Sequence, residues 1–257
     1  MARRPRDTSL PPPFLKRVWL PEDGDGSVAW PDWVDPDDYP FNMPLLRDGL
    51  DIRFENAVTI VVGENGSGKS TLLEAIATMA GFNEGGGAQR MAAVGEGWAS
   101  GADGGGLGHV LQGAWLPQVK RGWFFRAETF FSVARYLDEA GSPRANYLSA
   151  SHGEGFIDFF EDRLSEQGLF ILDEPEAALS PQRQFDFLKI LRRMQNAANC
   201  QVIMATHSPI LMALPDSALW QIDPFAIQPT TLEETAHYRL YDEFIRYPHE
   251  TVEAMIE

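Results

Sequence analysis

The stretch AVTIVVGENGSGKSTLLEAIA, residues 57–77, decides the fold of this chain. Its first six residues form an apolar run, which predicts a buried strand, and residues 71–77 have the pattern of a helix. The turn between them, GENGSGKST at 63–71, matches the GxxxxGK[ST] pattern of a phosphate-binding P-loop. A chance match in a glycine-rich chain is the alternative, and the strand and helix on either side disfavour it. The sequence therefore predicts nucleotide binding on an α/β fold.

The composition of this loop explains how it would hold phosphates. Backbone N–H groups must point into one concavity, which favours glycine because larger side chains would block the approach. The helix that follows adds unpaired N–H groups and the positive end of its dipole. We expect Lys69 to reach the β- and γ-phosphates and the Ser70 hydroxyl to ligate Mg²⁺. The predicted nucleotide-binding residues are Gly63, Glu64, Asn65, Gly66, Ser67, Gly68, Lys69, Ser70 and Thr71.

Length and composition indicate one α/β domain with elaborations. At 257 residues, 44% of them hydrophobic, the chain is long enough for a substantial core. No uninterrupted apolar run approaches the length of a membrane-spanning helix, so we expect no membrane insertion. Arginines near the N-terminus precede prolines instead of an apolar signal core, so we do not expect secretion. The single cysteine, Cys200, excludes an internal disulfide framework and a cysteine-rich zinc site, and a cytoplasmic location fits.

The net charge of −16 bears on the choice of partner. Proteins that grip DNA without sequence preference usually carry a basic stripe, because lysine and arginine displace counterions from the phosphates. The basic cluster of this chain lies in a proline-rich tail, although local patches such as Arg121 with Arg126 remain conceivable. Direct nucleic-acid binding by this chain alone is therefore not favoured.

The chain divides into a tail and one domain. Residues 1–13 are predicted to be a disordered, proline-rich tail, and residues 14–257 a single nucleotide-binding domain. Within that domain, glycine crowds residues 83–109, which predicts a mobile insertion. Residues 18–20 are expected to form an edge strand. No heptad repeat is present.

Strands and helices alternate along the rest of the chain, which predicts a mainly parallel sheet flanked by helices. The expected strands are at 122–128, 169–172, 202–205 and 219–222. The expected helices are at 129–140, 156–167, 182–197 and 236–257, the last broken near Pro248. Aromatic residues at helical spacing within 156–167 indicate core packing instead of a ligand site.

A pair of carboxylates, Asp173 and Glu174, ends the buried strand at 169–172. Open α/β sheets bind ligands at this end of their strands. Asp173 is placed to hold Mg²⁺, mostly through water, because magnesium dehydrates reluctantly. Glu174 is placed to polarise or orient the attacking water. Two acids that open a solvated loop are the alternative, which the P-loop makes the weaker one.

Two further motifs contain candidate site residues. His207 comes directly after the next buried strand, where it can hydrogen-bond a γ-phosphate oxygen or the attacking water; a structural histidine is the alternative. Ser151, Gly153 and Glu154 lie in the motif SHGEG, which opens the helix that contains Phe156. A serine and a glycine at a helix N-terminus form a second anion site.

In this order, GENGSGKST, SHGEG, LFILDEPEAALSPQ and ATHSP resemble the Walker A, signature, Walker B with D-loop, and H-loop motifs of the ABC-type ATPases. The resemblance covers roughly residues 45–210 and implies that Ser151, Gly153 and Glu154 bind nucleotide as the signature. His152 replaces the signature's first glycine, and Ser180 stands where the D-loop usually has aspartate.

Other family positions match less closely. The Q-loop residue, which in the family ends a strand, is best matched by Glu128, with Arg126 or Gln118 as alternatives. Tyr39 and Phe41 are candidates to stack on adenine. The resemblance also implies N-terminal antiparallel strands and a helical signature subdomain at about 110–167.

Within that superfamily, SxGE and DEPEAALS are similar to the small AAA family ATPases near the RecF and structural-maintenance-of-chromosomes branch. Fewer than a hundred residues separate the P-loop from the signature, which leaves no room for a long coiled coil. The resemblance therefore implies a free-standing ATPase head. In such heads two chains sandwich two ATP molecules, each on the P-loop of one subunit and against the signature of the other.

The function that this resemblance implies is Mg-ATP hydrolysis coupled to dimerisation. Lys69 and Mg²⁺ would neutralise charge, while Glu174 and His207 would align the water. The homodimer would then act as a switch on an unknown macromolecular effector, in DNA repair or defence for example. An ATP-binding subunit that energises a membrane transporter is the alternative. A small-molecule kinase is a third hypothesis, disfavoured because residues 83–109 hold only Arg90 as a lid arginine.

Overall fold

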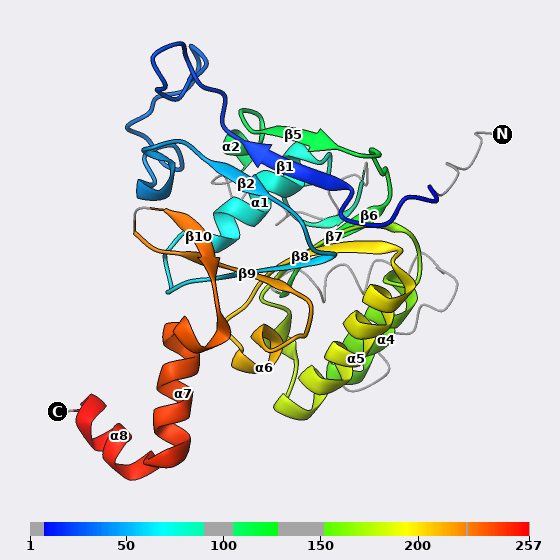
Figure 1. The fold of residues 1–257 in the computed structure, drawn as a ribbon, viewed down its shortest axis with the longest axis vertical. Helices are drawn as coiled ribbons and strands as arrows, with labels where there is room; N and C mark the ends of the chain where they lie inside the picture. Colours follow the sequence, from blue (N-terminus) through cyan, green and yellow to red (C-terminus); the bar gives the residue numbers. More distant parts are fainter. Residues whose placement is uncertain (1–7, 90–104, 128–151, 225, 257) are drawn as a thin grey trace.

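The computed structural model describes residues 8–89, 105–127, 152–224 and 226–256. Their main feature is a seven-stranded sheet in the order β10-β9-β3-β8-β7-β6-β4 (Figure 1). The five inner strands are mutually parallel, and the edge strands β4 and β10 are antiparallel to their neighbours. The strands are β3 (Val58–Val62), β4 (Gly87–Ala88), β6 (Gly122–Arg126), β7 (Gly168–Asp173), β8 (Cys200–Ala205), β9 (Ala218–Ile222) and β10 (Ile227–Thr230). The predicted mainly parallel sheet is confirmed.

A second, three-stranded antiparallel sheet lies over α1 in the order β2-β1-β5. It contains β1 (Leu15–Trp19), β2 (Asp51–Arg53) and β5 (Gln112–Trp115). Antiparallel strands near the N-terminus were expected and are present. The expected edge strand at 18–20 is corrected. β1 ends at Trp19 and is the central strand, because β2 pairs with one side of it and β5 with the other.

Helix α1 (Lys69–Met79) packs between the two sheets. Its buried Leu72, Leu73 and Ile76 share one core with residues of β1 and with Ile203 of β8. The other face of the main sheet is covered by α4 (His152–Arg163), α5 (Pro181–Ala197) and α6 (Pro209–Met212) (Figure 1). Short helices complete the fold: α2 (Gly105–Gly108), η1 (Pro44–Leu46), η3 (Pro175–Ala178) and η4 (Leu232–Glu234). The protein is thus layered, with helices on both faces of the main sheet.

The region predicted as a helical subdomain at about 110–167 has strands in its first part. β5 belongs to the antiparallel sheet, and β6 is an inner strand of the main sheet. The predicted helix at 156–167 is confirmed as α4, which begins earlier, at His152. The predicted helix at 129–140 lies outside the described residues. The strands at 112–115 and 122–126 therefore belong to the two sheets instead of to a helical subdomain.

The expected tail and insertion are described only in part. Thr8 exchanges two hydrogen bonds with the Gln167 side chain, at 2.7 and 2.9 Å, so residues 8–13 have a defined place instead of belonging to a disordered tail. In the expected insertion at 83–109, β4 pairs with β6 and α2 packs against α1. Residues 90–104 lie outside the described part of the chain.

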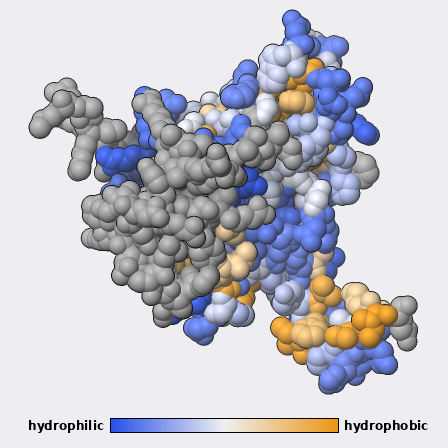
Figure 2. Space-filling view, turned by 180° about the vertical axis from the view of Figure 1, so that it is seen from behind, coloured by the Kyte–Doolittle hydropathy of each residue, from blue (hydrophilic) through white to orange (hydrophobic). Residues whose placement is uncertain are grey.

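The C-terminal residues form a helical hairpin that extends from the body (Figure 1). It consists of α7 (Ala236–Arg246) and α8 (Pro248–Ile256), and the expected break at Pro248 is confirmed. Apolar side chains gather on its surface, at the lower right of Figure 2. Across the described ranges, no helix combines the length and the apolar character needed to span a membrane.

Candidate functional site

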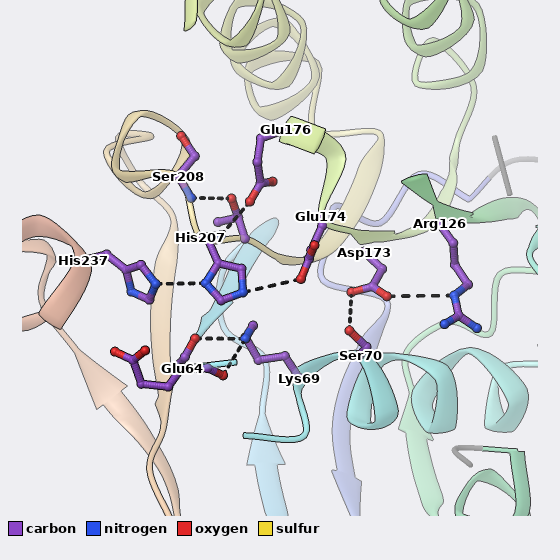
Figure 3. A network of polar contacts seen from close by, with 12 residues as sticks. Glu64, Lys69, Ser70, Arg126, Asp173, Glu174, Glu176, His207, Ser208 and His237 are labelled. Carbon is purple, nitrogen blue, oxygen red and sulfur yellow. Dashed lines mark hydrogen bonds and ion pairs between the residues drawn. The ribbon is translucent and has the colours of Figure 1, made fainter. Parts of the chain in front are cut away.

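The carboxyl edge of the main sheet brings together residues predicted from three separate motifs (Figure 3). β8 lies between β3 and β7, and all three are parallel. The P-loop follows β3, Asp173 ends β7, and His207 comes soon after β8. Parallel strands end at the same edge of a sheet, so loops that are far apart in the sequence meet there. The predicted phosphate, metal and water-binding residues are therefore neighbours.

Lys69 is held inside the loop that it belongs to. Its side chain is 4% exposed, and its Nζ donates hydrogen bonds to the carbonyl oxygens of Gly63 and Glu64, both at 2.9 Å. Burial lowers the pKa of Lys69, an effect opposed by nearby carboxylates, of which Glu174 is the strongest. These carbonyl bonds keep the ammonium group at the mouth of the loop, where a phosphate could replace either partner.

Three glycines of the loop occupy positions that other residues would disturb. A Cβ on Gly63 would lie 2.7 Å from Ser67 Oγ and 2.9 Å from the carbonyl oxygen of Ile222. Gly66 and Gly68 have φ angles of 77° and 95°, in the left-handed region that favours glycine. Gly68 also precedes α1, whose first turn directs its N–H groups toward the loop. The loop is thus shaped by close approach as well as by backbone conformation.

Ser67 offers a test of whether this loop suits a phosphate. Its Oγ is buried, and within the described part of the chain no hydrogen-bond partner lies within reach. A buried hydroxyl without a partner is costly, and a phosphate oxygen is an acceptor that would satisfy it. Together with the N-terminus of α1 and the Lys69 ammonium group, this donor set fits an anionic ligand.

Ser70 and Asp173 form the candidate magnesium site. Ser70 Oγ donates to Asp173 Oδ1 at 3.0 Å, and the other carboxylate oxygen lies 4.0 Å from Arg126 Nε. Magnesium takes oxygen ligands and keeps several waters, so a hydroxyl and a carboxylate beside a phosphate site fit it. No group of three His, Cys, Asp or Glu side chains among the described residues is arranged to hold a metal without other ligands. The pair therefore suits a cation bound largely through phosphate and water.

The three candidates for the Q-loop position differ in where they lie. Arg126 ends β6 beside Asp173 of β7, and its Nη1 lies 3.3 Å from Glu74 Oε2 of α1. Gln118 precedes β6 and is exposed, at the opposite end of that strand from Asp173. Glu128, the best sequence match, lies outside the described residues. Of the two described candidates, Arg126 is the one at the site.

Glu174 has an unusual backbone. Its φ and ψ angles are 50° and 54°, a left-handed conformation that costs a non-glycine residue about 1–3 kcal/mol. Its backbone N–H donates to the carbonyl oxygen of Ala205 at 3.0 Å, which ties the turn to β8. The side chain is 42% exposed, and Oε1 lies 3.4 Å from His207 Nε2. The strained turn directs a carboxylate toward the end of the neighbouring strand.

His207 is fixed from two sides. Its backbone N–H donates to Glu176 Oε1 at 2.6 Å, and its ring Nδ1 lies 2.9 Å from His237 Nε2 of α7. Burial, followed by the charge of Lys69, lowers the pKa of His207, and burial likewise lowers the pKa of His237. Burial raises the pKa of Glu176. No local pattern in the sequence points to His237, which belongs to no motif and reaches the site through the placement of α7.

The two described signature residues belong to α4. Gly153 and Glu154 are in the first turn of α4, and Ser151 lies outside the described residues. Helix α4 covers the face of the sheet opposite α1, where it packs with α5. Ser180, at the D-loop position, caps α5 by accepting a hydrogen bond from the Arg183 N–H at 3.4 Å. The structure thus joins the P-loop, the carboxylates and His207, while the signature helix starts on another face.

The two candidates for adenine stacking differ in their surroundings. Phe41 packs edge-on against Trp30, with ring centroids 5.5 Å apart, and is part of the core around α1. The Tyr39 ring is half exposed, and its hydroxyl lies 2.5 Å from Thr71 Oγ1 in the first turn of α1. Tyr39 is therefore the more accessible aromatic beside the loop.

Comparisons with known proteins match both halves of this site. Residues 41–90 match the family described as AAA domain, and residues 154–213 match the family described as AAA domain, putative AbiEii toxin, Type IV TA system. The first segment contains the P-loop, and the second contains Asp173, Glu174 and His207. The resemblance to AAA family ATPases is confirmed in these two segments, and the fold is that of a P-loop NTPase.

Two curated relatives match a small part of the chain. Protein ea59 of Escherichia phage lambda is 36% identical over 80 residues, which are 29% of this chain and 15% of the phage protein. The OLD nuclease of Thermus scotoductus is 39% identical over 56 residues, 22% of this chain and 11% of the nuclease. The matched stretches thus span well under a fifth of either relative.

Solved structures resemble the whole chain more loosely. The SMC head domain from Thermotoga maritima is 16% identical, with a TM-score of 0.45, and the match covers 84% of this chain and 99% of that one. CbiO1 from Clostridium perfringens, part of an ABC transporter complex, is 15% identical, with a TM-score of 0.46, and the match covers 94% and 99%. These values are too low to bear on activity.

Proposed function

We propose that the chain binds Mg-ATP at the carboxyl edge of its main sheet and hydrolyses it to ADP and phosphate. The observation that carries this proposal is the position of Glu174 and His207. The two side chains face each other at 3.4 Å beside a P-loop whose Ser67 hydroxyl is buried without a partner. A phosphate site with a carboxylate and an imidazole next to it has the groups that phosphoryl transfer to water requires.

Each side chain has a distinct part in this proposal. The loop N–H groups and Lys69 hold the phosphates and offset the negative charge that develops during transfer. Glu174 accepts a hydrogen bond from the attacking water and orients it, while His207 donates from its ring to a phosphate oxygen or to that water. Mg²⁺, held by the Ser70 hydroxyl and through water by Asp173, would supply further charge neutralisation when bound.

We further propose that the working unit is a homodimer around two nucleotides. In support, Gly153 and Glu154 open α4, which packs with α5 on the face of the sheet opposite α1, so they belong to a different element from the P-loop. ATP would then join two chains, and hydrolysis would release them, which makes a switch. The partial relatives include an OLD nuclease and a family described as a putative toxin, which favours an effector in defence or DNA repair.

Hydrolysis and dimerisation are tested with one set of variants. Phosphate release is measured with saturating Mg-ATP for the wild type, Lys69→Ala and Glu174→Gln. Lys69→Ala should lose nucleotide binding, because it removes the cation buried in the loop. Glu174→Gln should keep binding and lose about 10²–10⁴-fold in rate, as expected for removal of a general base. Glu55→Gln, an exposed change ahead of β3, is the matched control and should retain full activity.

The dimer is tested with the same variants by light scattering. Glu174→Gln should form a dimer with Mg-ATP and return to a monomer when the nucleotide is removed. A monomer for Glu174→Gln at saturating Mg-ATP would overturn the sandwich, and full activity of that variant would overturn the assigned role of Glu174. Phosphate release by Lys69→Ala at the wild-type rate would overturn the nucleotide site itself.

A further inference from the structure

His207 has a second histidine as its neighbour, supplied by a helix outside the motifs. His207 Nδ1 and His237 Nε2 are 2.9 Å apart, and the ring centroids are 5.0 Å apart at an interplanar angle of 57° (Figure 3). At this distance one nitrogen must donate and the other must accept. The pair therefore has two possible arrangements of its protons, and the rest of the site decides between them.

The other ring nitrogen of His207 decides which of the two histidines donates the hydrogen bond. Nε2 is buried, has no hydrogen-bond partner among the described residues, and lies 3.4 Å from Glu174 Oε1. A carboxylate can only accept, so the favoured neutral tautomer of His207 carries its proton on Nε2. Nδ1 of His207 is then an acceptor, and His237 must donate from its own Nε2. Burial lowers the pKa of both histidines, which is consistent with two neutral rings.

The start of α7 fixes where His237 lies. Thr235 is fully buried and caps the helix: its Oγ1 accepts from the Tyr238 N–H at 3.2 Å and donates to the carbonyl oxygen of Leu232 at 2.7 Å. The short helix η4 precedes it and is held at its own start, where the Thr231 N–H and hydroxyl both donate to Glu234 Oε2, at 3.2 and 3.0 Å. His237 is the second residue of this capped helix, so its position is set by elements outside the catalytic loops.

We propose that His237 is a positioning residue, which donates a hydrogen bond to His207 Nδ1 and thereby holds the His207 tautomer that presents Nε2–H to the reacting phosphate and water. This inference rests on the proposed ATPase activity, although the tautomer itself exists without nucleotide. It also links the catalytic edge to the C-terminal hairpin. Because His237 belongs to α7, any shift of that helix lengthens the bond and releases the His207 ring.

The tautomer is measured first, in the protein without nucleotide. Two-bond ¹⁵N–¹H spectra of the imidazole rings at pH 8 distinguish the two neutral tautomers, and the chain has only 5 histidines to assign. We expect His207 in the Nε2–H form in the wild type and a mixture in His237→Phe, which keeps a ring but has no donor. His237→Gln restores an N–H donor and should restore the Nε2–H form.

Turnover is measured next with the same proteins. His237→Phe should lower kcat about tenfold with little change in KM for ATP, because the lost hydrogen bond orients His207 and does not bind nucleotide. His237→Gln should recover most of kcat. His249→Phe, a matched change on the exposed start of α8, should leave both constants unchanged. Thr235→Ala, which weakens the cap, should lower kcat less than His237→Phe. Urea unfolding of each variant establishes that it is folded.

The outcomes separate this proposal from the ATPase proposal. A His207 ring that stays in the Nε2–H form in His237→Phe overturns the positioning role, whatever the activity of the protein. An unchanged kcat in His237→Phe overturns it as well, even if the tautomer shifts. A wild-type protein that does not hydrolyse ATP overturns the proposed function, whereas the spectra still decide whether His237 sets the His207 tautomer.

Discussion

Phe187 and Phe244 show how differently two regions of this molecule are built. Phe187 of α5 is fully buried in the core beneath the main sheet, where its ring centroid lies 4.8 Å from that of Phe160. Phe244 of α7 is 44% exposed and lines an apolar groove of about 360 Å³ between the hairpin helices. The body therefore holds the carboxyl edge of the main sheet through close packing, whereas the hairpin depends on the cap of α7 and on contacts with α6 and η4. The closely packed residues and the exposed apolar residues thus lie in different parts of the chain.

The largest expected effect comes from truncating these two phenylalanines in parallel. Phe187→Ala should lower the free energy of unfolding by about 3–5 kcal/mol, because it removes buried surface and leaves a cavity. Phe244→Ala should cost under about 1 kcal/mol, because much of that ring is already in water. Urea titration followed by circular dichroism measures both. Equal losses would contradict the comparison, since they would mean that the hairpin is as closely packed as the body.

A smaller effect on stability is expected at the P-loop, at the edge of the body. Gly63→Ala places a methyl group against the Ile222 carbonyl oxygen and Ser67 Oγ, and crowding of this kind costs about 1–3 kcal/mol. Gly24→Ala is the control, because a Cβ there has no neighbour within 4 Å. Thermal unfolding of the two variants compares them. A Gly63→Ala protein as stable as Gly24→Ala would show that the loop can move aside.

The residues at the carboxyl edge of the main sheet could be predicted because their signals are local. Residues 57–71 contain the strand, the turn and the start of the helix in one continuous stretch, and Asp173 directly ends an apolar run. The same property placed His207, since parallel strands of similar length end at one edge of a sheet. Nothing beyond adjacent residues was needed to locate these groups.

What the sequence did not reveal depends on contacts between distant segments. β1 became a central strand because it pairs with residues 51–53 and 112–115, which no local pattern connects to it. His237 entered the site because α7 docks beside α6, and the choice of Arg126 over Gln118 needed β6 to end beside Asp173. In each case tertiary packing, and not local propensity, decided the position.

Acid should lower the free energy of unfolding through His207 and His237, which lie where the body meets the hairpin. The pKa of His207 and of His237 is lowered in the folded protein by burial and by Lys69, while Glu64 and Glu174 act against this for His207. As the pH falls below about 6.5, the unfolded chain binds protons that the folded chain does not, so the free energy of unfolding decreases. Glu176, whose pKa is raised, acts in the opposite direction at lower pH.

A comparison of variants isolates the contribution of the histidine pair to this pH dependence. The free energy of unfolding is measured between pH 7.5 and 5.5 for the wild type, His237→Gln and the exposed control His249→Gln. The decrease should be shallower in His237→Gln, which lacks one of the two groups, and unchanged in His249→Gln. The same slope in all three proteins would show that the contact between His207 and His237 does not resist protonation.

The last comparison uses the labelling of Cys200, which lies in the body. Its thiol is buried at the start of β8, and burial raises its pKa to about 12, so almost none of it is thiolate at neutral pH. A thiol reagent should therefore label it only when the body opens, at a rate that follows global stability. Phe187→Ala should accelerate labelling strongly, whereas Phe244→Ala should leave the rate close to that of the wild type. Rapid labelling of Phe244→Ala would mean that the hairpin and the body open together, and the two regions would then have to be treated as one cooperative unit.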